Sequence, residues 1–568
     1  MTEPLSVVIC ALNSQYIHSS LAPWYLLAGI ETYCTGDIKA QVIEATINEE
    51  LEAVVERILA QNPQVIGFSC YIWNIEVIKK IVALVKQELA DAVIILGGPE
   101  VSYNVANTLR ENPLVQYVVS GEGEKALAQL LNAICYGESV TDIPGVSYRE
   151  GEELLVAEPY YDWEAPPSPY TKAYFQALQG RIAYLETSRG CPYFCAFCLS
   201  GYGNVRYFDL ERGKRELISL ANSGTRTIKF VDRTFNSNRA RALELFSFVI
   251  DNYGSAIPEG VCCHFEIAGD ILDDQTLDLL AKAPAGSIQF EIGIQSFNAD
   301  TLTAIRRRTN VELLESNLRR LINKGNIHIH IDLIAGLPYE DLESFATSFN
   351  KAYELRPHML QLGFLKVLYG SQIHADPEKY PCSYEPLAPY EVTETPWLSA
   401  EDLAYLHRLE DALKRLYNSG RFRRTLDYLL ESTELTPFKL FGDFAEHIKE
   451  TEIRGIPLED YIGLVYEYFA TQSQIDKKKL RDKLVCDYLA TNSTGRLPRI
   501  LQIKDPAYKV LKRLKQEGKV GNPEQKGMRG IALLYSEAVV VWADYQAKDP
   551  VTGEYPLKKC TKESLDLV

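Results

Sequence analysis

Three cysteines lie close together in the segment LETSRGCPYFCAFC, at positions i, i+4 and i+7: Cys191, Cys195 and Cys198. Three thiolates on one short loop can each bind one iron of a 4Fe–4S cubane, whose fourth iron then has no protein ligand. Open coordination positions are typical of catalytic metals, whereas structural zinc takes four ligands. No further cysteine or histidine lies nearby to complete a zinc site. The spacing therefore favours a 4Fe–4S cluster over zinc.

The other nine cysteines are scattered along the chain. In a reducing compartment they are expected to stay as free thiols, and most are expected to be small buried hydrophobic residues. They are Cys10, Cys34, Cys70, Cys135, Cys262, Cys263, Cys382, Cys486 and Cys560.

The cysteine segment follows the first of six strand-like apolar runs, and the first five of these runs are each followed by a helix-like segment. One such segment begins after Asn310, a residue suited to cap a helix, and ends before Gly325. Six strands are fewer than the eight of a closed β/α barrel. We therefore expect an α/β partial barrel or a curved open sheet. The runs cover 182–188, 225–232, 263–269, 287–294, 327–336 and 359–367.

The first 136 or so residues also alternate between strand and helix. Their apolar runs are β-branched and lack polar alternation, which indicates strands buried on both faces of a parallel sheet. A helix is predicted over 74–90. This region is thus expected to form an open sheet with helices on both sides. The runs are 5–11, 41–45, 65–69, 92–96 and 115–119.

Composition suggests four regions: 1–140, 141–176, 177–400 and 401–568. The second is rich in proline, tyrosine and acidic residues, and predicts a small hairpin followed by a linker. The last is mostly helical, with a β pair predicted at 531–536 and 538–545.

The cysteine segment resembles the radical S-adenosylmethionine (SAM) superfamily, whose hallmark is C-x3-C-x2-C with an aromatic residue before the last cysteine, here Phe197. The resemblance covers 182–367 and implies a partial (β/α)6 barrel. It implies that the open iron chelates SAM, and that an injected electron cleaves SAM to a 5′-deoxyadenosyl radical. It also implies a flavodoxin- or ferredoxin-type electron donor.

The same resemblance suggests residues that contact SAM at the carboxyl ends of later strands. Asp232 ends strand two, Glu266 lies on strand three, Glu291 and Gln295 lie on strand four, and Gly336 follows strand five. Strand ends are where β/α barrels build their sites. The alternative for each is structural: the two glutamates could form salt bridges, and the glycine could serve only a turn.

The N-terminal region resembles the Rossmann-like cobalamin-binding domain that precedes many radical SAM enzymes. Ser69 after strand three and Gly97 and Gly98 after strand four match positions that lie against the nucleotide tail of cobalamin. The usual D-x-H-x-x-G motif is absent. His18, in the loop after strand one, is the nearest candidate for a cobalt ligand, but it could equally contact a substrate or phosphate, or cap the following helix.

His328 and His330 alternate along strand five, so both lie on one face of that strand. If that face is the barrel interior, these histidines could touch substrate. A structural position is at least as compatible with the pattern.

Together the resemblances imply a cobalamin-dependent radical SAM enzyme that transfers a methyl group to an unactivated centre of a small-molecule or peptide substrate of unknown identity. One alternative is a radical SAM cyclase or rearrangement enzyme, and another is a non-catalytic iron–sulfur electron carrier or sensor. Methylthiotransferases are disfavoured because the first region has no second cysteine triad. The C-terminal region resembles an uncharacterised extension of such proteins, to which no chemistry is assigned.

The whole chain limits the partners that are expected. It has 568 residues with 59 basic and 76 acidic side chains, a net charge of −17. This balance argues against duplex nucleic acid, which needs a basic face. Neither a signal peptide nor a stretch of 18 apolar residues is recognisable, so a cytoplasmic protein with no membrane span is expected.

Overall fold

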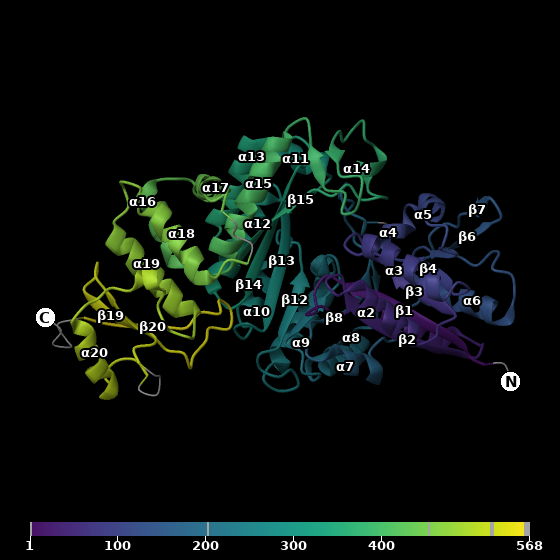
Figure 1. Ribbon diagram of the computed structural model, residues 1–568, viewed down its shortest axis with the longest axis horizontal. Coiled ribbons are helices and arrows are strands. Elements are labelled where there is room, and N and C mark those ends of the chain that lie inside the picture. Colours follow the sequence, from purple (N-terminus) through teal and green to yellow (C-terminus); the bar gives the residue numbers. More distant parts are fainter. Residues whose placement is uncertain (1–2, 202–203, 452–454, 523–526, 562–568) are drawn as a thin grey trace. The chain divides into compact units, whose positions relative to one another are not determined.

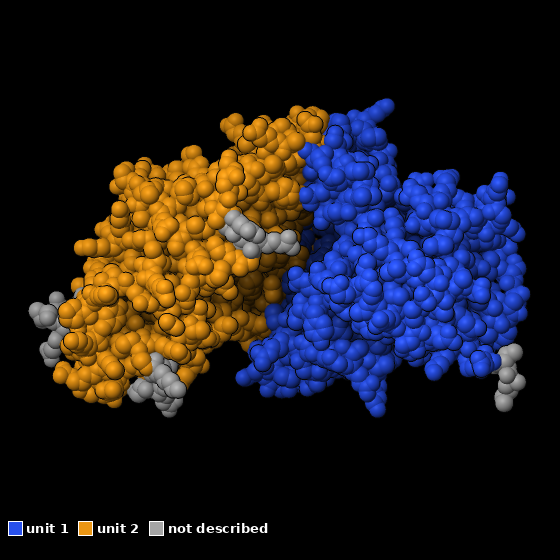
Figure 2. Space-filling model, viewed as in Figure 1, with its two compact units in different colours: residues 1–268, 304–308, 365–393 blue, residues 269–303, 309–364, 394–568 orange. Residues whose placement is uncertain are grey.

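The computed structural model describes residues 3–201, 204–451, 455–522 and 527–561. The chain divides into two compact units (Figure 2). Unit 1 contains 1–268, 304–308 and 365–393, and unit 2 contains 269–303, 309–364 and 394–568.

A mostly parallel sheet in unit 1 is built by the N-terminal region, in the order β2-β1-β3-β4-β5-β6-β7. Strands β1 to β5 are parallel and confirm the five predicted strands, whereas β6 and β7 join antiparallel. The bounds are β1 Leu5–Asn13, β2 Ile38–Thr46, β3 Val65–Ser69, β4 Val93–Gly97, β5 Tyr117–Val119, β6 Val146–Glu150 and β7 Glu153–Leu155.

Helices cover both faces of this sheet, as predicted. Val8 and Cys10 of β1 belong to a core that includes Ile78 of α3, while Val7 and Ile9, which point the other way, are buried as well. Helix α1 packs against α6 and α2 against α3. The helices are α1 Ala22–Tyr33, α2 Leu51–Leu59, α3 Ile75–Glu88, α4 Pro99–Ser102, α5 Val105–Glu111 and α6 Gly123–Tyr136.

The predicted linker 141–176 takes part in regular structure at both ends. Its hairpin is β6 and β7, which extends the first sheet, and its last residues begin helix α7 (Lys172–Leu178), capped by the Thr171 side chain. This helix has only seven residues, too few to show a helical period in the sequence.

The second series of strands follows the predicted positions. In unit 1, β8 (Ala183–Leu185), β11 (Thr227–Phe230) and β12 (Cys262–Glu266) are parallel neighbours, with helices α8 (Leu210–Ala221) and α9 (Arg239–Asn252). A 3₁₀ turn, η1 (Phe235–Ser237), precedes α9. The short strands β9 (Ser188–Arg189) and β10 (Arg206–Tyr207) pair antiparallel on either side of the cysteine segment.

In unit 2, β13 (Ile288–Gln295), β14 (His328–Ala335) and β15 (Met359–Phe364) are parallel neighbours. Helix α12 begins and ends as predicted: the Asn310 side chain accepts from Leu313 N, and Gly325 is left-handed. Its bounds and those of the other helices here are α10 Asp274–Leu280, α11 Ala299–Ala304, α12 Val311–Lys324 and α13 Leu342–Glu354. The chain then returns to unit 1 for α14 (Gln372–Ala375) and β16 (Ser383–Tyr384), and β17 (Val392–Glu394) ends at the boundary with unit 2.

The rest of unit 2 is mostly helical, followed by a small antiparallel sheet (Figure 1). The predicted β pair is present as β18 (Ile531–Leu534) and β19 (Val539–Ala543); a third strand, β20 (Leu557–Thr561), adds to β19. The helices are α15 Ala400–Leu413, η2 Lys414–Asn418, α16 Arg423–Thr433, α17 Pro437–His447, α18 Leu458–Phe469, α19 Lys477–Thr491, η3 Arg499–Leu501 and α20 Ala507–Gln516. Among the described residues, none of these helices is long and apolar enough to cross a membrane.

Candidate cofactor-binding site

The cysteine triad lies on the loop between β9 and β10, just after the first strand of the second series, as predicted. The backbone of Ala196 fixes this loop: its N–H donates to Ile305 O at 2.9 Å, and its carbonyl accepts from Ile373 N at 3.0 Å. Cys191 and Cys195 are buried and Cys198 is half-buried. Phe197, beside them, is half-buried too.

Each cysteine sulfur lies near a polar group that suits a thiolate. Thr234 Oγ1 is 3.4 Å from Cys191 Sγ, Ser200 N donates to Cys198 Sγ at 3.3 Å, and Arg307 Nη1 donates to Cys195 Sγ at 3.7 Å. Burial raises the pKa of the Cys195 thiol, and the Arg307 cation opposes this rise. Groups that support metal ligands in this way are characteristic of metal sites, so the loop fits a cluster held by three thiolates. Arg307 and Thr234 were not predicted, because no motif in the sequence connects them to the cysteines.

Asp232 follows β11 and is buried beneath the residues that lead into the cysteine loop. Its carboxylate accepts from Thr187 N at 2.9 Å, from Thr187 Oγ1 at 2.7 Å and from Ser188 Oγ at 2.6 Å. Burial raises the pKa of Asp232, and these hydrogen bonds lower it. The contacts make Asp232 a support for the strand before Cys191; its predicted contact with SAM stays a prediction.

Glu266, at the end of β12, forms an ion pair with Arg233 at 3.3 Å. This is the structural alternative raised for it from the sequence. Arg233 also lines the cavity described below.

The remaining residues predicted to contact SAM lie in unit 2. Glu291 on β13 faces His330 on β14, with Oε2 3.8 Å from Nδ1, and His330 Nε2 lies 2.8 Å from Asp332 Oδ1. Gln295 sits at a register shift of β13 with a positive φ of 73°, and Gly336 after β14 has a φ of 88°. The structure thus brings Glu291 together with His330 and with Asp332, a residue the sequence analysis missed.

Unit 1 contains a cavity of about 690 Å³ that joins two parts of the chain distant in sequence. On one side lie Ser69 and Gly97, the last residues of β3 and β4, together with Gly98. On the other side lie residues that flank the cysteine triad: Arg189, Gly190, Leu199 and Ser200. Because β3 and β4 are parallel neighbours, their carboxyl ends meet at this edge.

The backbone around position 98 accommodates only a glycine. Its φ is +114°, and a Cβ built on it would lie 2.5 Å from the carbonyl oxygen of Cys70. A Cβ on Gly97 would meet Val119 O at 3.4 Å and Val119 Cβ at 3.9 Å, both ordinary contacts. Gly98 thus allows a close approach to Cys70, and the predicted position of both glycines against the nucleotide tail stays a prediction.

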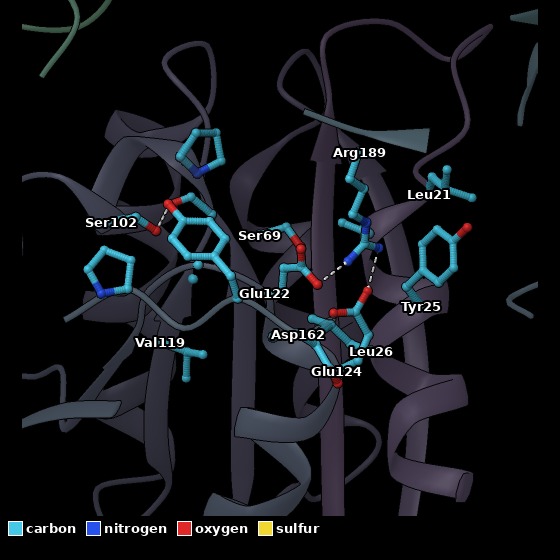
Figure 3. A pocket seen from close by; sticks show the side chains of 18 of the residues that line it. Leu21, Tyr25, Leu26, Ser69, Ser102, Val119, Glu122, Glu124, Asp162 and Arg189 are labelled. Carbon is cyan, nitrogen blue, oxygen red and sulfur yellow. Dashed lines mark hydrogen bonds and ion pairs between the residues drawn. The ribbon is translucent and has the colours of Figure 1, made fainter. Parts of the chain in front are cut away.

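Figure 3 shows Arg189 pointing into a group of carboxylates on the cavity wall. Its guanidinium contacts Glu122 at 3.0 Å, Glu124 at 2.6 Å and Glu186 at 3.0 Å. Burial raises the pKa of Glu186 to about 7, and Arg189 opposes this rise. Glu122 and Glu124 belong to a GEGE run at 121–124, and their partner Arg189 could not be predicted from the sequence.

A segment from the predicted linker forms another wall. Tyr160 pairs with Gly121 as a parallel bridge, and Tyr160 N and O bond to Ser120 O at 3.0 Å and Glu122 N at 2.7 Å. Tyr161 and Trp163, on either side of Asp162, line the cavity, and Trp163 is 84% exposed.

His18 does not line this cavity. Its backbone bridges to Ile182 and its Nδ1 lies 2.7 Å from the Tyr184 hydroxyl. Burial and nearby Lys229 lower the pKa of His18. The predicted role of His18 as a cobalt ligand stays a prediction.

Three family models match successive parts of the chain. Residues 8–131 match the B12 binding domain, 185–352 match the Radical SAM superfamily, and 378–525 match a Protein of unknown function (DUF4080).

Two relatives with assigned names each match about half of the chain. The chain is 29% identical over 349 residues to the cobalamin-dependent radical SAM methyltransferase TokK from Streptomyces tokunonensis, covering 56% of this chain and 49% of TokK. It is 29% identical over 321 residues to 2-(S-pantetheinyl)-carbapenam-3-carboxylate methyltransferase from Streptantibioticus cattleyicolor, covering 52% and 46%. The matches span about half the length of these relatives.

The fold is similar to that of the cobalamin-dependent S-adenosylmethionine radical enzyme OxsB, solved with aqua-cobalamin. The TM-score is 0.60 with 14% identity, and the match covers 86% of this chain and 79% of OxsB. Its B12-binding match at 8–131 and its radical SAM match at 185–352, which contains the cysteine triad, make the chain similar to cobalamin-dependent radical SAM enzymes.

Proposed function

We propose that this protein is a cobalamin-dependent radical SAM methyltransferase that cleaves SAM reductively at a 4Fe–4S cluster and methylates an unactivated centre. One observation carries the proposal: a single cavity is lined both by Ser69, Gly97 and Gly98 and by the residues on either side of the cysteine triad. Methyl transfer from cobalamin to a radical needs the two cofactors close together, and a shared cavity wall supplies this proximity.

The chain's own residues fit the proposed cofactors. When bound, the cluster with SAM supplies a 5′-deoxyadenosyl radical, and cobalamin supplies the methyl group. Cys191, Cys195 and Cys198 would bind three irons, and Arg307 and Ser200 N would stabilise thiolate charge through the hydrogen bonds described above.

The cavity residues would hold cobalamin. The Ser69 hydroxyl can bond a polar edge of the nucleotide tail, and the exposed Trp163 ring offers it a stacking surface. We propose that Phe197, Asp232, Glu266, Glu291, Gln295 and Gly336 assist SAM binding, the buried Asp232 acting through the strand that it supports.

We propose that a flavodoxin- or ferredoxin-type protein donates the electron. We also propose that the protein is cytoplasmic, because thiols stay reduced in that compartment. The substrate is proposed to be a small molecule or peptide. The net charge of −17 supports a partner other than duplex nucleic acid.

The test is anaerobic reconstitution with iron and sulfide, followed by hydroxocobalamin. We expect a cluster absorption band, bound cobalamin, and 5′-deoxyadenosine from SAM after reduction. Cys195→Ala should abolish deoxyadenosine formation, whereas Cys34→Ala, which alters a half-buried cysteine outside the loop, should leave it intact. A protein that holds a cluster but forms no deoxyadenosine would instead be an electron carrier or sensor.

Cobalamin content separates methyl transfer from other radical chemistry. Deoxyadenosine formation by a protein that binds no cobalamin would favour the cyclase or rearrangement alternative.

A further inference from the structure

Arg189 connects the two walls of the cavity. It lies two residues before Cys191, on β9, and its guanidinium bonds to Glu122 and Glu124 at the start of α6 in the first sheet's domain. Glu186 completes the set through Nε at 3.0 Å. The guanidinium also lies over the ring of Tyr25, 5.2 Å from its centroid. Arg189 is therefore held from several sides in one orientation.

The planar guanidinium suits this task because it offers five donors in a fixed geometry. Three carboxylates converge on it, and a second arginine, Arg206 on β10, contacts Glu122 at 2.7 Å. Removing one cation from such a buried group leaves carboxylates that repel one another. The position of the Glu122–Glu124 segment thus depends on Arg189.

Residues on both sides of the cysteine triad line the cavity. Gly190 precedes Cys191, and Leu199 and Ser200 follow Cys198; all three line the cavity. A cluster bound to the three cysteines fixes this loop, because metal ligation removes its conformational freedom. Cluster loading should therefore fix part of the cobalamin cavity.

We infer that Arg189 is a positioning residue that couples cobalamin binding in the cavity to cluster loading in the cysteine loop. The inference rests on the proposed function, because it takes cobalamin as the ligand of the cavity. In linkage terms, the cluster should raise cobalamin affinity, and the link between the two sites should pass through the Arg189 carboxylate contacts.

The experiment measures hydroxocobalamin dissociation constants by anaerobic equilibrium dialysis with cobalt analysis, for cluster-loaded and cluster-free protein. In the wild type the cluster-loaded form should bind about tenfold more tightly. In Arg189→Lys the two forms should bind with equal affinity, because one ammonium cannot reproduce the three-way contact.

Arg181→Lys is the matched control. Arg181 is also a buried arginine that joins the first sheet to the second series, through Glu44 on β2 at 2.9 Å, but it does not line the cavity. The Arg181→Lys variant should unfold more easily than the wild type but keep the wild-type ratio of cobalamin affinities between the cluster-loaded and cluster-free forms. If Arg189→Lys does not fold, Glu124→Gln weakens the same contact from the other side and should reduce the ratio.

Two results would overturn the inference: an affinity ratio of one in the wild type, or the wild-type ratio retained in Arg189→Lys, including the case in which both forms of the variant bind equally more weakly. That case would mean that Arg189 only touches the ligand. If neither wild-type form binds hydroxocobalamin, the proposed function fails together with the inference. A ratio of one with tight binding overturns the coupling alone.

Discussion

Glu340 is a fully buried carboxyl group in the turn after β14. Its Oε1 accepts hydrogen bonds from Ser296 Oγ at 2.5 Å and from Ser348 Oγ at 3.0 Å, so it ties this turn to the end of β13, next to Gln295. Burial raises the pKa of Glu340 from 4.5 to about 7, and the two serine hydroxyls lower it. The protonated form thus persists to a higher pH in the folded protein than in the unfolded chain.

This shift has a definite sign for stability. Below pH 4.5 the carboxyl is protonated in both folded and unfolded chains, and no penalty arises. Between pH 4.5 and the folded pKa of about 7, the unfolded chain releases this proton while the folded protein keeps it, so the free energy of unfolding falls. The loss is complete once the pH has risen through the folded pKa. Glu340→Gln, which carries no charge, should therefore stabilise the protein at about pH 8 by up to about 3 kcal/mol, and much less at about pH 5.

Denaturant unfolding of both proteins at the two pH values measures this difference. A stability difference that does not change with pH would contradict the expected role of Glu340 ionisation. The comparison uses the difference between the proteins, so the titration of other carboxyl groups cancels.

The turn from β4 into α4 should tolerate an added side chain at Gly97 but not at Gly98. An added Cβ at Gly98 would lie 2.5 Å from Cys70 O, in a left-handed backbone conformation, whereas at Gly97 it meets an ordinary contact. Gly98→Ala should destabilise unit 1 by about 1–3 kcal/mol.

Gly97→Ala is the matched variant and should fold with nearly wild-type stability. Thermal unfolding and hydroxocobalamin affinity distinguish the two variants. Equal melting temperatures would show that the close approach to Cys70 does not constrain this turn.

Local patterns in the sequence predicted most of the strands and the caps of α12. Asn310 and Gly325 act on their own backbone, so their roles follow from nearby residues. β20 escaped prediction because LKKCT has the polar composition of an exposed edge strand. The triad was predictable because its members lie within eight residues, whereas the partners of Arg189 and Cys195 come from distant segments that only the fold brings together.

For the whole molecule, hydroxocobalamin should stabilise unit 1 selectively, because every residue that lines the cavity belongs to that unit. At a concentration of about 100 times Kd, a ligand that binds only the folded state adds about 2.7 kcal/mol. Hydrogen exchange should slow in peptides that contain the ends of β3 and β4, and stay unchanged in β18 to β20.

Cobinamide, which lacks the nucleotide tail, serves as the matched ligand. It should protect the ends of β3 and β4 less than hydroxocobalamin does. Equal protection by both ligands would contradict the placement of the tail near Ser69.

The bridge between Gly121 and Tyr160 bears on how such a domain can be exchanged between proteins. The composition changes near residue 140, but the segment beyond this boundary still supplies Pro159, Tyr161, Asp162 and Trp163 to the cavity wall. A recombination event that cut at the compositional boundary would separate a ligand site from part of its own wall. A cut after Trp163 would keep this segment with the first sheet, whereas the rest of the wall, from Glu186 to Arg233, would have to come from the neighbouring radical SAM segment.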